Sequence, residues 1–207
     1  QALATIEALA AEGAMATLDL LGEEVRLPAK SVATAEEYER MLDAIAARSL
    51  VANISIKPTA LGLAIDEQLC HQNVERVVAA ASKHGNFVRI DMEDATTTDA
   101  TLRIYKDLHT RYGNVGVVLQ AYMRRTLADI HALPKAGANV RICKGIYVEP
   151  RAIAYKEYET VRLNYLHALE KLLVRGAYVG IATHDDHLIC GALGLIDHHN
   201  VPRERYE

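Results

Sequence analysis

The 207-residue sequence predicts an α/β fold in which parallel strands alternate with helices along a single domain, residues 1–207. Six short apolar runs, each bounded by glycine, asparagine or a charged residue, have the form of strands buried on both faces of a parallel sheet. Segments with helical periodicity lie between these runs. The composition, 50% hydrophobic and 24% charged, is ordinary for a globular protein, and no linker or sequence repeat divides the chain.

The six expected strands are rich in β-branched residues and follow one another at regular intervals. The first lies in the apolar segment 14–21. The others are VANISIK (51–57), FVRIDME (87–93), VGVVLQAY (115–122), NVRICKG (139–145) and YVGIATHD (178–185).

Helices are expected between the strands. Thr34 and Glu37 have the spacing of a capping box at the start of a helix over 34–48. Thr98 is expected to cap a second helix, and Pro150 to lie in the first turn of a third, long one. Residues expected to face the sheet recur every three or four positions: Tyr38, Met41, Leu42 and Ile45; Leu102, Tyr105 and Leu108; Tyr158, Val161, Tyr165, Leu169 and Leu172.

Parallel strands with helical crossovers form either a doubly wound sheet or a (β/α)8 barrel. A doubly wound sheet predicts a glycine-rich nucleotide turn, but neither G-x-G-x-x-G nor G-x-x-x-x-G-K-[ST] occurs. A barrel predicts polar side chains at the carboxyl ends of many strands, because its active site is built there. Five consecutive strands end in this way, with Lys57, Asp91, Glu93, Gln120, Arg141, Lys144, Thr183, His184 and Asp185, and we therefore predict a TIM-type barrel.

Strand parity refines the placement of these charges, because residues two apart share one face of a strand. Lys57, Asp91 and Arg141 are expected inside the barrel, compensating one another, since an unpaired buried ion costs several kcal/mol. Lys144 lies on the opposite parity from Arg141 and reaches the site only if the strand has already turned, which Gly145 permits.

Several functional classes are disfavoured. A net charge of −4 and scattered basic residues argue against nucleic-acid binding, and no apolar run is long enough to span a membrane. Cys70, Cys143 and Cys190 are too few for a disulfide framework, which favours a reducing compartment. His184 and His187 lack the i,i+4 spacing of a helical zinc motif, so they are interpreted as hydrogen-bonding residues and no metal site is predicted.

The cations at the predicted barrel mouth suit an anionic small molecule, and no serine-hydrolase motif is present. Physical reasoning leaves the reaction open. A barrel that forms a Schiff base through Lys57 or Lys144, as aldolases do, is one alternative. An inactive barrel fragment or binding module is another.

Five blocks resemble the bacterial proline dehydrogenase family, in order and with family-like spacing: SIKPTALG (55–62), RIDMED (89–94), VVLQAYMRRT (117–126), RICKGIYVEP (141–150) and GIATHD (180–185). TLDLLGEEV (17–25) resembles the family's first barrel strand. The resemblance implies an FAD-containing (β/α)8 barrel that oxidises L-proline to Δ1-pyrroline-5-carboxylate and passes electrons to a quinone. It implies a cytoplasmic location, with peripheral contact to the inner membrane as an open alternative.

The resemblance also implies roles for particular residues. Asp91 and Arg141 are expected to be catalytic, and Lys57 and Tyr147 to bind the substrate. The residues expected to line the FAD are Met92, Gln120, Arg141, Lys144, Gly145, Ile146, Thr183 and His184. The segment RERYE (203–207) resembles the start of the family's seventh strand, so this chain is expected to lack the last strand and the final helix, which carry further substrate-binding residues.

Overall fold

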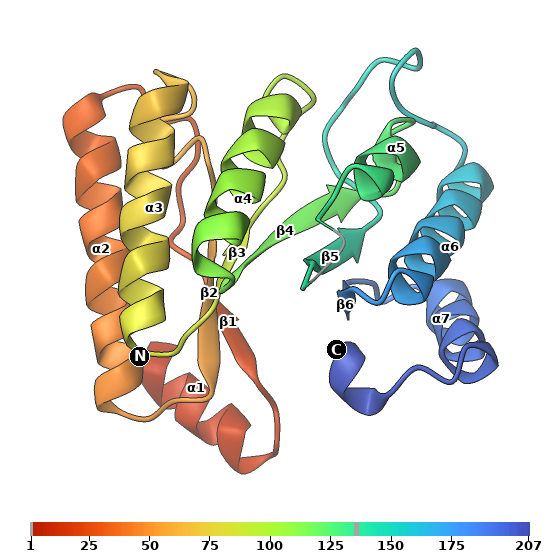
Figure 1. Ribbon diagram of the computed structural model, residues 1–207, viewed down its shortest axis with the longest axis horizontal. Coiled ribbons are helices and arrows are strands. Elements are labelled where there is room, and N and C mark those ends of the chain that lie inside the picture. The colour runs from red at the N-terminus through yellow and green to blue at the C-terminus, as the bar shows by residue number, and fades with distance from the viewer. Residues whose placement is uncertain (1, 135–136) are drawn as a thin grey trace. The chain divides into compact units, whose positions relative to one another are not determined.

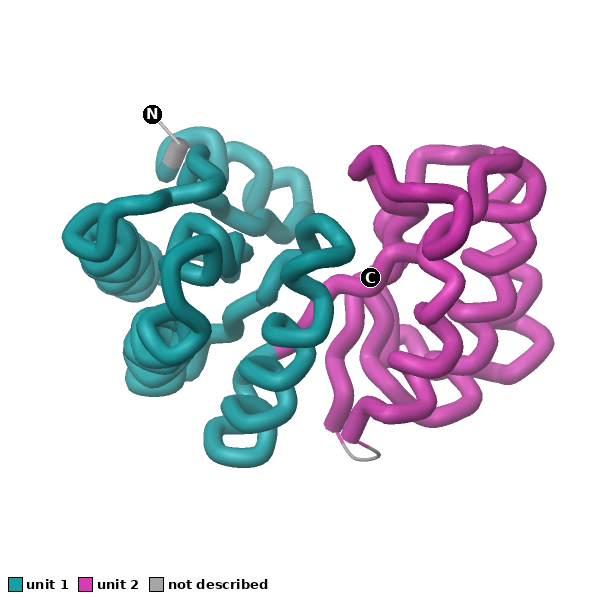
Figure 2. The backbone as a smooth tube through the Cα atoms, turned by 90° about the horizontal axis from the view of Figure 1, so that it is seen from above, with its two compact units in different colours: residues 1–115 teal, residues 116–207 magenta. Residues whose placement is uncertain are grey.

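The computed structural model describes residues 2–134 and 137–207 of the chain. These residues form two compact units, one up to residue 115 and one from residue 116 (Figure 2). The first unit contains α1 (Ala2–Ala11), β1 (Ala16–Leu18), α2 (Pro28–Ala47), β2 (Ala52–Ile56), α3 (Glu67–Lys83), β3 (Val88–Ile90) and α4 (Thr98–Tyr112). The single-domain interpretation stays a prediction.

The second unit contains the remaining elements of the chain. They are β4 (Val115–Gln120), which begins at the last residue of the first unit, α5 (Thr126–His131), β5 (Asn139–Cys143), α6 (Tyr158–Val174), β6 (Tyr178–Ile181), α7 (Asp186–His198) and a short 3-10 turn, η1 (Arg203–Arg205). All six expected strands are present, although most are shorter than the apolar runs that predicted them.

Each unit contains three parallel strands in sequence order. In the first, β2 lies between β1 and β3, with Ala16 opposite Ala52 and Ile54 opposite Val88. In the second, β5 lies between β4 and β6, with Val140 opposite both Val117 and Val179. Helices connect the parallel strands, as Figure 1 shows, and the predicted α/β class is confirmed.

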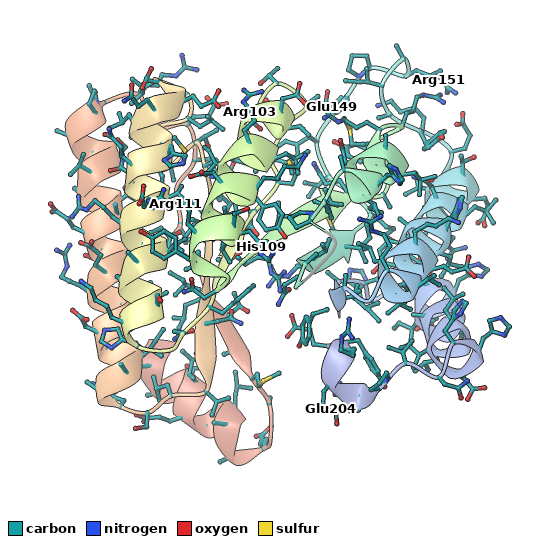
Figure 3. The ribbon with its side chains drawn as sticks, in the orientation of Figure 1. Arg103, His109, Arg111, Glu149, Arg151 and Glu204 are labelled. Carbon is teal, nitrogen blue, oxygen red and sulfur yellow. The ribbon has the colours of Figure 1, made fainter. Side chains whose placement is uncertain are left out.

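Helices cover the sheet of each unit with one apolar face. In the first unit α2 and α3 lie side by side (Figure 1), and Tyr38, Leu42 and Ile45 of α2 are buried as expected. On the outer surface, Arg103 of α4 pairs with Glu67 of α3 at 2.7 Å; both Arg103 and Arg111 of α4 are labelled in Figure 3. Exposed pairs of this kind contribute about 0–1 kcal/mol, so the apolar contacts are the main stabilising term.

The capping box predicted at Thr34 is wrong, because α2 begins six residues earlier. Pro28 occupies the first turn, where its fixed φ suits a helix and its missing N–H would have no partner. Thr34 therefore lies inside the helix, where its hydroxyl donates to the Lys30 carbonyl at 3.0 Å.

Two other helix starts also differ from the prediction. Thr98 is the first residue of α4 rather than its cap, and its hydroxyl donates to the Asp94 carbonyl at 3.2 Å. Pro150 lies outside α6. It begins a turn in which its carbonyl accepts a hydrogen bond from the Ala154 N–H at 3.0 Å. Tyr158, expected to face the sheet, is 53% exposed at the start of α6, whereas the other four expected residues of this helix are buried.

Candidate active site

In the first unit Lys57 directly follows β2, and its ammonium group pairs with the carboxylate of Asp19, which directly follows β1. The Tyr38 hydroxyl donates to the other oxygen of Asp19 at 2.9 Å. Partial burial lowers the pKa of Lys57, but the hydrogen bond and the negative charge of Asp19, together with the charge of Asp91, outweigh burial and raise it. Lys57 is therefore held as a cation at a fixed position.

Asp91 directly follows β3 and is half-buried. The Ser55 hydroxyl donates to its Oδ1 atom at 2.6 Å. The prediction gave Lys57 either the substrate or Asp91 as its partner, but Lys57 makes its ion pair with Asp19. Sequence reasoning missed Asp19, although its place at the end of the first strand was the same signal that identified Lys57.

The two residues after Asp91 are buried. Met92 was expected to line the FAD, but it is only 8% exposed. Glu93 accepts hydrogen bonds from the Thr59 N–H at 2.8 Å and from its hydroxyl at 2.5 Å. Burial raises the pKa of Glu93, and the Thr59 hydrogen bonds oppose that shift. Glu93 thus ties the loop after β2 to the loop after β3.

In the second unit the predicted residues again follow the strands. Gln120 is the last residue of β4 and is buried. Arg141 lies in the middle of β5, not at its end as predicted, because the strand continues to Cys143. Arg141 lies opposite Gly180 of β6, and a Cβ atom at Gly180 would approach the Arg141 stem to 3.4 Å. That distance is ordinary van der Waals contact, and the tighter approach of such a Cβ atom is to Glu207 Oε1, at 3.0 Å.

Lys144 comes directly after β5, so the strand ends where the prediction required a turn. Its carbonyl accepts from the Tyr122 N–H at 2.8 Å. Gly145 has a φ of +106°, and a Cβ atom there would lie 2.1 Å from the Tyr122 ring. Only glycine fits this position, because both the backbone conformation and the close approach exclude a side chain.

The residues after Gly145 expose apolar surface beside this turn. Ile146 is 86% exposed and Tyr147 is half-buried. After β6, the Thr183 hydroxyl accepts from the Asp185 N–H at 3.1 Å, and His184 is exposed. The turns after β5 and β6 therefore combine a cation, exposed apolar atoms and hydrogen-bonding side chains within one unit.

Asp185 of the second unit has several hydrogen-bond donors around it, and sequence reasoning noted it only as a strand-end residue without a role in binding or catalysis. It accepts from Lys144 at 3.2 Å, from the Tyr158 hydroxyl at 2.5 Å and from Arg162 at 2.7 and 3.0 Å. The hydrogen bonds from Arg162, Tyr158 and Lys144 hold the pKa of Asp185 well below its usual range, despite burial. Asp185 is therefore ionised at physiological pH.

The structure thus brings the predicted residues together in two sets. One set, in the first unit, contains Lys57 and Asp91 with Met92; the other, in the second unit, contains Gln120, Arg141, Lys144, Gly145, Ile146, Tyr147, Thr183 and His184. The expected mutual compensation of Lys57, Asp91 and Arg141 involves both units and stays a prediction.

No group of three or more histidine, cysteine, aspartate or glutamate side chains between residues 2 and 207, outside the undescribed positions 135–136, is arranged to hold a metal ion. No helix in the described part of the chain is both long and apolar enough to cross a membrane.

Comparison with solved structures defines the class of fold. A crystal structure of a variant of Bradyrhizobium japonicum Proline Utilization A (PutA) matches with a TM-score of 0.80, 20% identity and coverage of 93% of this chain and 23% of the other. A crystal structure of a bifunctional PutA protein matches with a TM-score of 0.78, 20% identity and the same coverage. The predicted TIM-type barrel class is confirmed.

Sequence comparison identifies the family. The family model described as proline dehydrogenase matches residues 2–207, and the chain belongs to that family. It is 37% identical to proline dehydrogenase 2 of Bacillus subtilis over 203 residues, covering 98% of this chain and 67% of the relative. It is 34% identical to proline dehydrogenase of Deinococcus radiodurans, covering all of this chain and 68% of the relative. The predicted resemblance to the proline dehydrogenase family is confirmed. The predicted enzyme class, an oxidoreductase that acts on proline, is confirmed with it.

Proposed function

We propose that this protein is an FAD-dependent proline dehydrogenase that oxidises L-proline to Δ1-pyrroline-5-carboxylate and passes the electrons to a quinone. The observation that carries the proposal is the family match over residues 2–207. The five blocks that resemble the family each span the carboxyl end of a strand. The chain spans about two thirds of the length of its curated relatives and 23% of the PutA chains. The activity is therefore proposed for the complete protein.

The side chains of the second unit fit a flavin dinucleotide. Lys144 supplies a positive charge for an anionic group, and Gly145 leaves the backbone bare at a turn beside the exposed Ile146. Gln120 and Thr183 add hydrogen-bonding groups of the kind that bind ring heteroatoms. When bound, FAD supplies the hydride acceptor. We assign Arg141 and His184 to the same binding set; the role of Met92 rests on the family resemblance alone and stays a prediction.

The substrate is assigned to the charged groups that follow the strands. Lys57, kept charged by Asp19, binds the carboxylate of proline, and Tyr147 contacts its ring. Asp91, held by the Ser55 hydroxyl, balances the positive nitrogen of the substrate. Arg141 is catalytic in that its charge stabilises negative charge arriving at the flavin, an electrostatic effect made stronger where water is excluded.

The Schiff-base alternative is not favoured by the state of the lysines. A lysine nucleophile must lose its proton, which requires a lowered pKa. The Asp19 carboxylate raises the pKa of Lys57 despite partial burial, and Lys144 is paired with Asp185. Quinone as the electron acceptor, and peripheral contact with a membrane surface to reach it, remain parts of the proposal that rest on the family alone.

The test is the visible absorption spectrum of the purified complete protein. We expect oxidised flavin bands that bleach on anaerobic addition of L-proline. Arg141→Met should retain less flavin and lower its reduction potential, because a positive charge favours the reduced, more negative cofactor. A colourless protein that does not bind added FAD would contradict the proposal, and normal flavin content with an unshifted potential in the variant would remove Arg141 from the site.

A further inference from the structure

The second unit holds a cluster of four side chains, Lys144, Tyr158, Arg162 and Asp185, which we call the Asp185 cluster. We propose that Arg162 and Asp185 are positioning residues: Arg162 neutralises Asp185, so that Asp185 fixes the place of Lys144 without cancelling its charge toward an anionic group of the bound flavin dinucleotide. This inference rests on the proposed function and adds two residues to it.

The geometry separates a strong ion pair from a weaker one. Arg162 engages both oxygens of Asp185, with Nη2 at 2.7 Å from Oδ1 and Nε at 3.0 Å from Oδ2. This bidentate geometry is the strongest form of an arginine–carboxylate contact. Lys144 reaches only Oδ2, at 3.2 Å. The charge of Asp185 is therefore satisfied chiefly by Arg162.

Burial makes this division matter. The Asp185 side chain is 2% exposed, so it cannot be screened by water and must be neutralised by its neighbours. The side chains of Arg162 and Lys144 are 21% and 28% exposed. The Lys144 side chain thus keeps a solvent-accessible part, and two cations share one buried anion.

Tyr158 fixes the spacing of the two cations. Its hydroxyl donates to Asp185 Oδ2 at 2.5 Å, while its ring lies 4.2 Å from the Arg162 guanidinium carbon and 5.0 Å from the Lys144 ammonium. Tyr158 precedes Arg162 by one turn of α6, so the helix holds ring and guanidinium together. This contact explains why Tyr158 faces the cluster and not the sheet.

The charges around the cluster leave one positive charge in excess. Lys144 and Arg162 oppose Asp185, and the further partner of Arg162 is Glu159, whose carboxylate lies 2.9 Å from Nη1. Glu159 is 70% exposed and is largely screened by water and salt, so it offsets little of the buried charge. The excess is available at Lys144, whose ammonium has donors beyond the single bond to Asp185.

The hypothesis is tested by changing the charge of the cluster in the complete protein. In Arg162→Gln, the negative charge of Asp185 cancels the positive charge of Lys144. Arg162→Lys keeps the positive charge at position 162 and should leave Lys144 as it is in the parent. The double variant Arg162→Gln with Asp185→Asn removes one charge of each sign and restores the excess; asparagine also preserves the cap of α7. Lys171→Gln, an exposed position on α6, is the matched control for the loss of one positive charge.

The first readout is equilibrium dialysis of the apoprotein against FAD. We expect Arg162→Gln to weaken binding about tenfold, the usual effect of one charge-assisted hydrogen bond. Arg162→Lys and the double variant should bind within about threefold of the parent. Unchanged binding in Arg162→Gln, or a double variant as weak as Arg162→Gln, would overturn the proposal. Riboflavin is the second probe: weakening of both ligands places the charge at the ring, and weakening of FAD alone places it at the pyrophosphate.

The second readout does not depend on flavin and so separates the failure of this inference from the failure of the proposed function. Lys144 is labelled with a lysine-acetylating reagent and quantified by mass spectrometry. We expect slower labelling in Arg162→Gln, where Asp185 holds Lys144 alone, and faster labelling in Asp185→Asn. Equal labelling in the parent and both variants would overturn the positioning role, whether or not the protein binds FAD.

Discussion

Two lysines that follow strands, Lys57 and Lys144, are each fixed by a carboxylate at the end of a neighbouring segment of the same unit. For Lys57 this is Asp19, and for Lys144 it is Asp185. Sequence reasoning identified both lysines from their position after an apolar run, because that signal is local. It could not assign the carboxylates, because each lies 38 or more residues away in the chain and is brought near only by strand pairing.

Replacing Lys57 with methionine tests its role as the carboxylate-binding cation. We expect kcat/KM for proline to fall by about ten- to 100-fold, the loss of one charge-assisted contact, while thermal stability changes little. The assay is proline-dependent dye reduction. Lys83→Met, an exposed position at the end of α3, is the matched control and should behave as the parent does. Unaltered kinetics in Lys57→Met would exclude substrate binding by this residue.

The hydrogen bonds between Thr59 and Glu93 predict a pH-dependent stability. Burial raises the pKa of Glu93 above its usual value, so the folded protein holds the carboxylate ionised at a cost, and this cost disappears as falling pH protonates it. Thr59→Val removes one of the hydrogen bonds that oppose the shift. We expect the free energy of unfolding to drop by about 1–2 kcal/mol at pH 8, and the difference from the parent to shrink as the falling pH protonates Glu93.

Urea denaturation at several pH values measures this effect. Thr110→Val is the control, since Thr110 is exposed and its hydroxyl donates to the Lys106 carbonyl within its own helix. A stability difference between Thr59→Val and the parent that stays constant from pH 8 down to the ordinary glutamate value of 4.5 would contradict a raised pKa of Glu93.

At the scale of elements, strand existence could be predicted and helix starts could not. A strand that is buried on both faces, such as β4, is apolar throughout, so composition alone reveals it. A helix start depends on which backbone N–H groups lack partners, and at α2 the chain resolves this with Pro28 instead of a side-chain cap. The helix α3 was not assigned, although its buried residues recur at helical spacing: Cys70, Asn73, Val74, Val77, Val78 and Ala81.

The turn after β5 is an element whose geometry admits one residue type. Gly145→Ala requires a left-handed backbone and a Cβ atom 2.1 Å from the Tyr122 ring. We expect a loss of several kcal/mol in stability, since strain and overpacking add, together with reduced flavin content. Absorbance and thermal denaturation measure the two effects.

Gly194→Ala is the matched control for that substitution. Gly194 lies inside α7, and among the described residues a Cβ atom there would meet nothing within 4 Å beyond its own helix backbone and chain neighbours. Because alanine favours a helix over glycine, we expect this variant to gain up to about 1 kcal/mol. A Gly145→Ala protein as stable and as yellow as the parent would mean that the turn is free to rearrange.

At the scale of the whole molecule, the family could be recognised because its blocks keep their order along the chain and each ends a strand. Neither the division into two compact units nor the ion pairs within them was predicted, because both depend on contacts between residues far apart in sequence. The sequence could identify the candidate site residues, because each follows an apolar run. It could not identify their ion-pair partners, because those partners lie far away in the chain.

The reactivity of two of the three cysteine thiols measures how often the core of the first unit opens to solvent. Cys70 is fully buried in the first unit, and its Sγ atom lies 3.4 Å from the Pro58 carbonyl; Cys190 is exposed on α7. Burial raises the pKa of Cys70 from 9.0 to about 12, which lowers its thiolate fraction on the order of a thousandfold. At pH 8 we expect iodoacetamide to label Cys190 readily and Cys70 only through opening of the first unit.

Mass spectrometry of the separate peptides follows each thiol, and urea-unfolded protein gives the rate without protection. The labelling rate of Cys70 should rise with urea along the same curve as the loss of circular dichroism if the core around α3 opens only on unfolding. A variant that weakens this core, Val77→Ala, should speed the labelling of Cys70 and leave Cys190 unchanged, because Val77 is fully buried on the same helix. Rapid labelling of Cys70 in the native parent protein would contradict a closed core in the first unit.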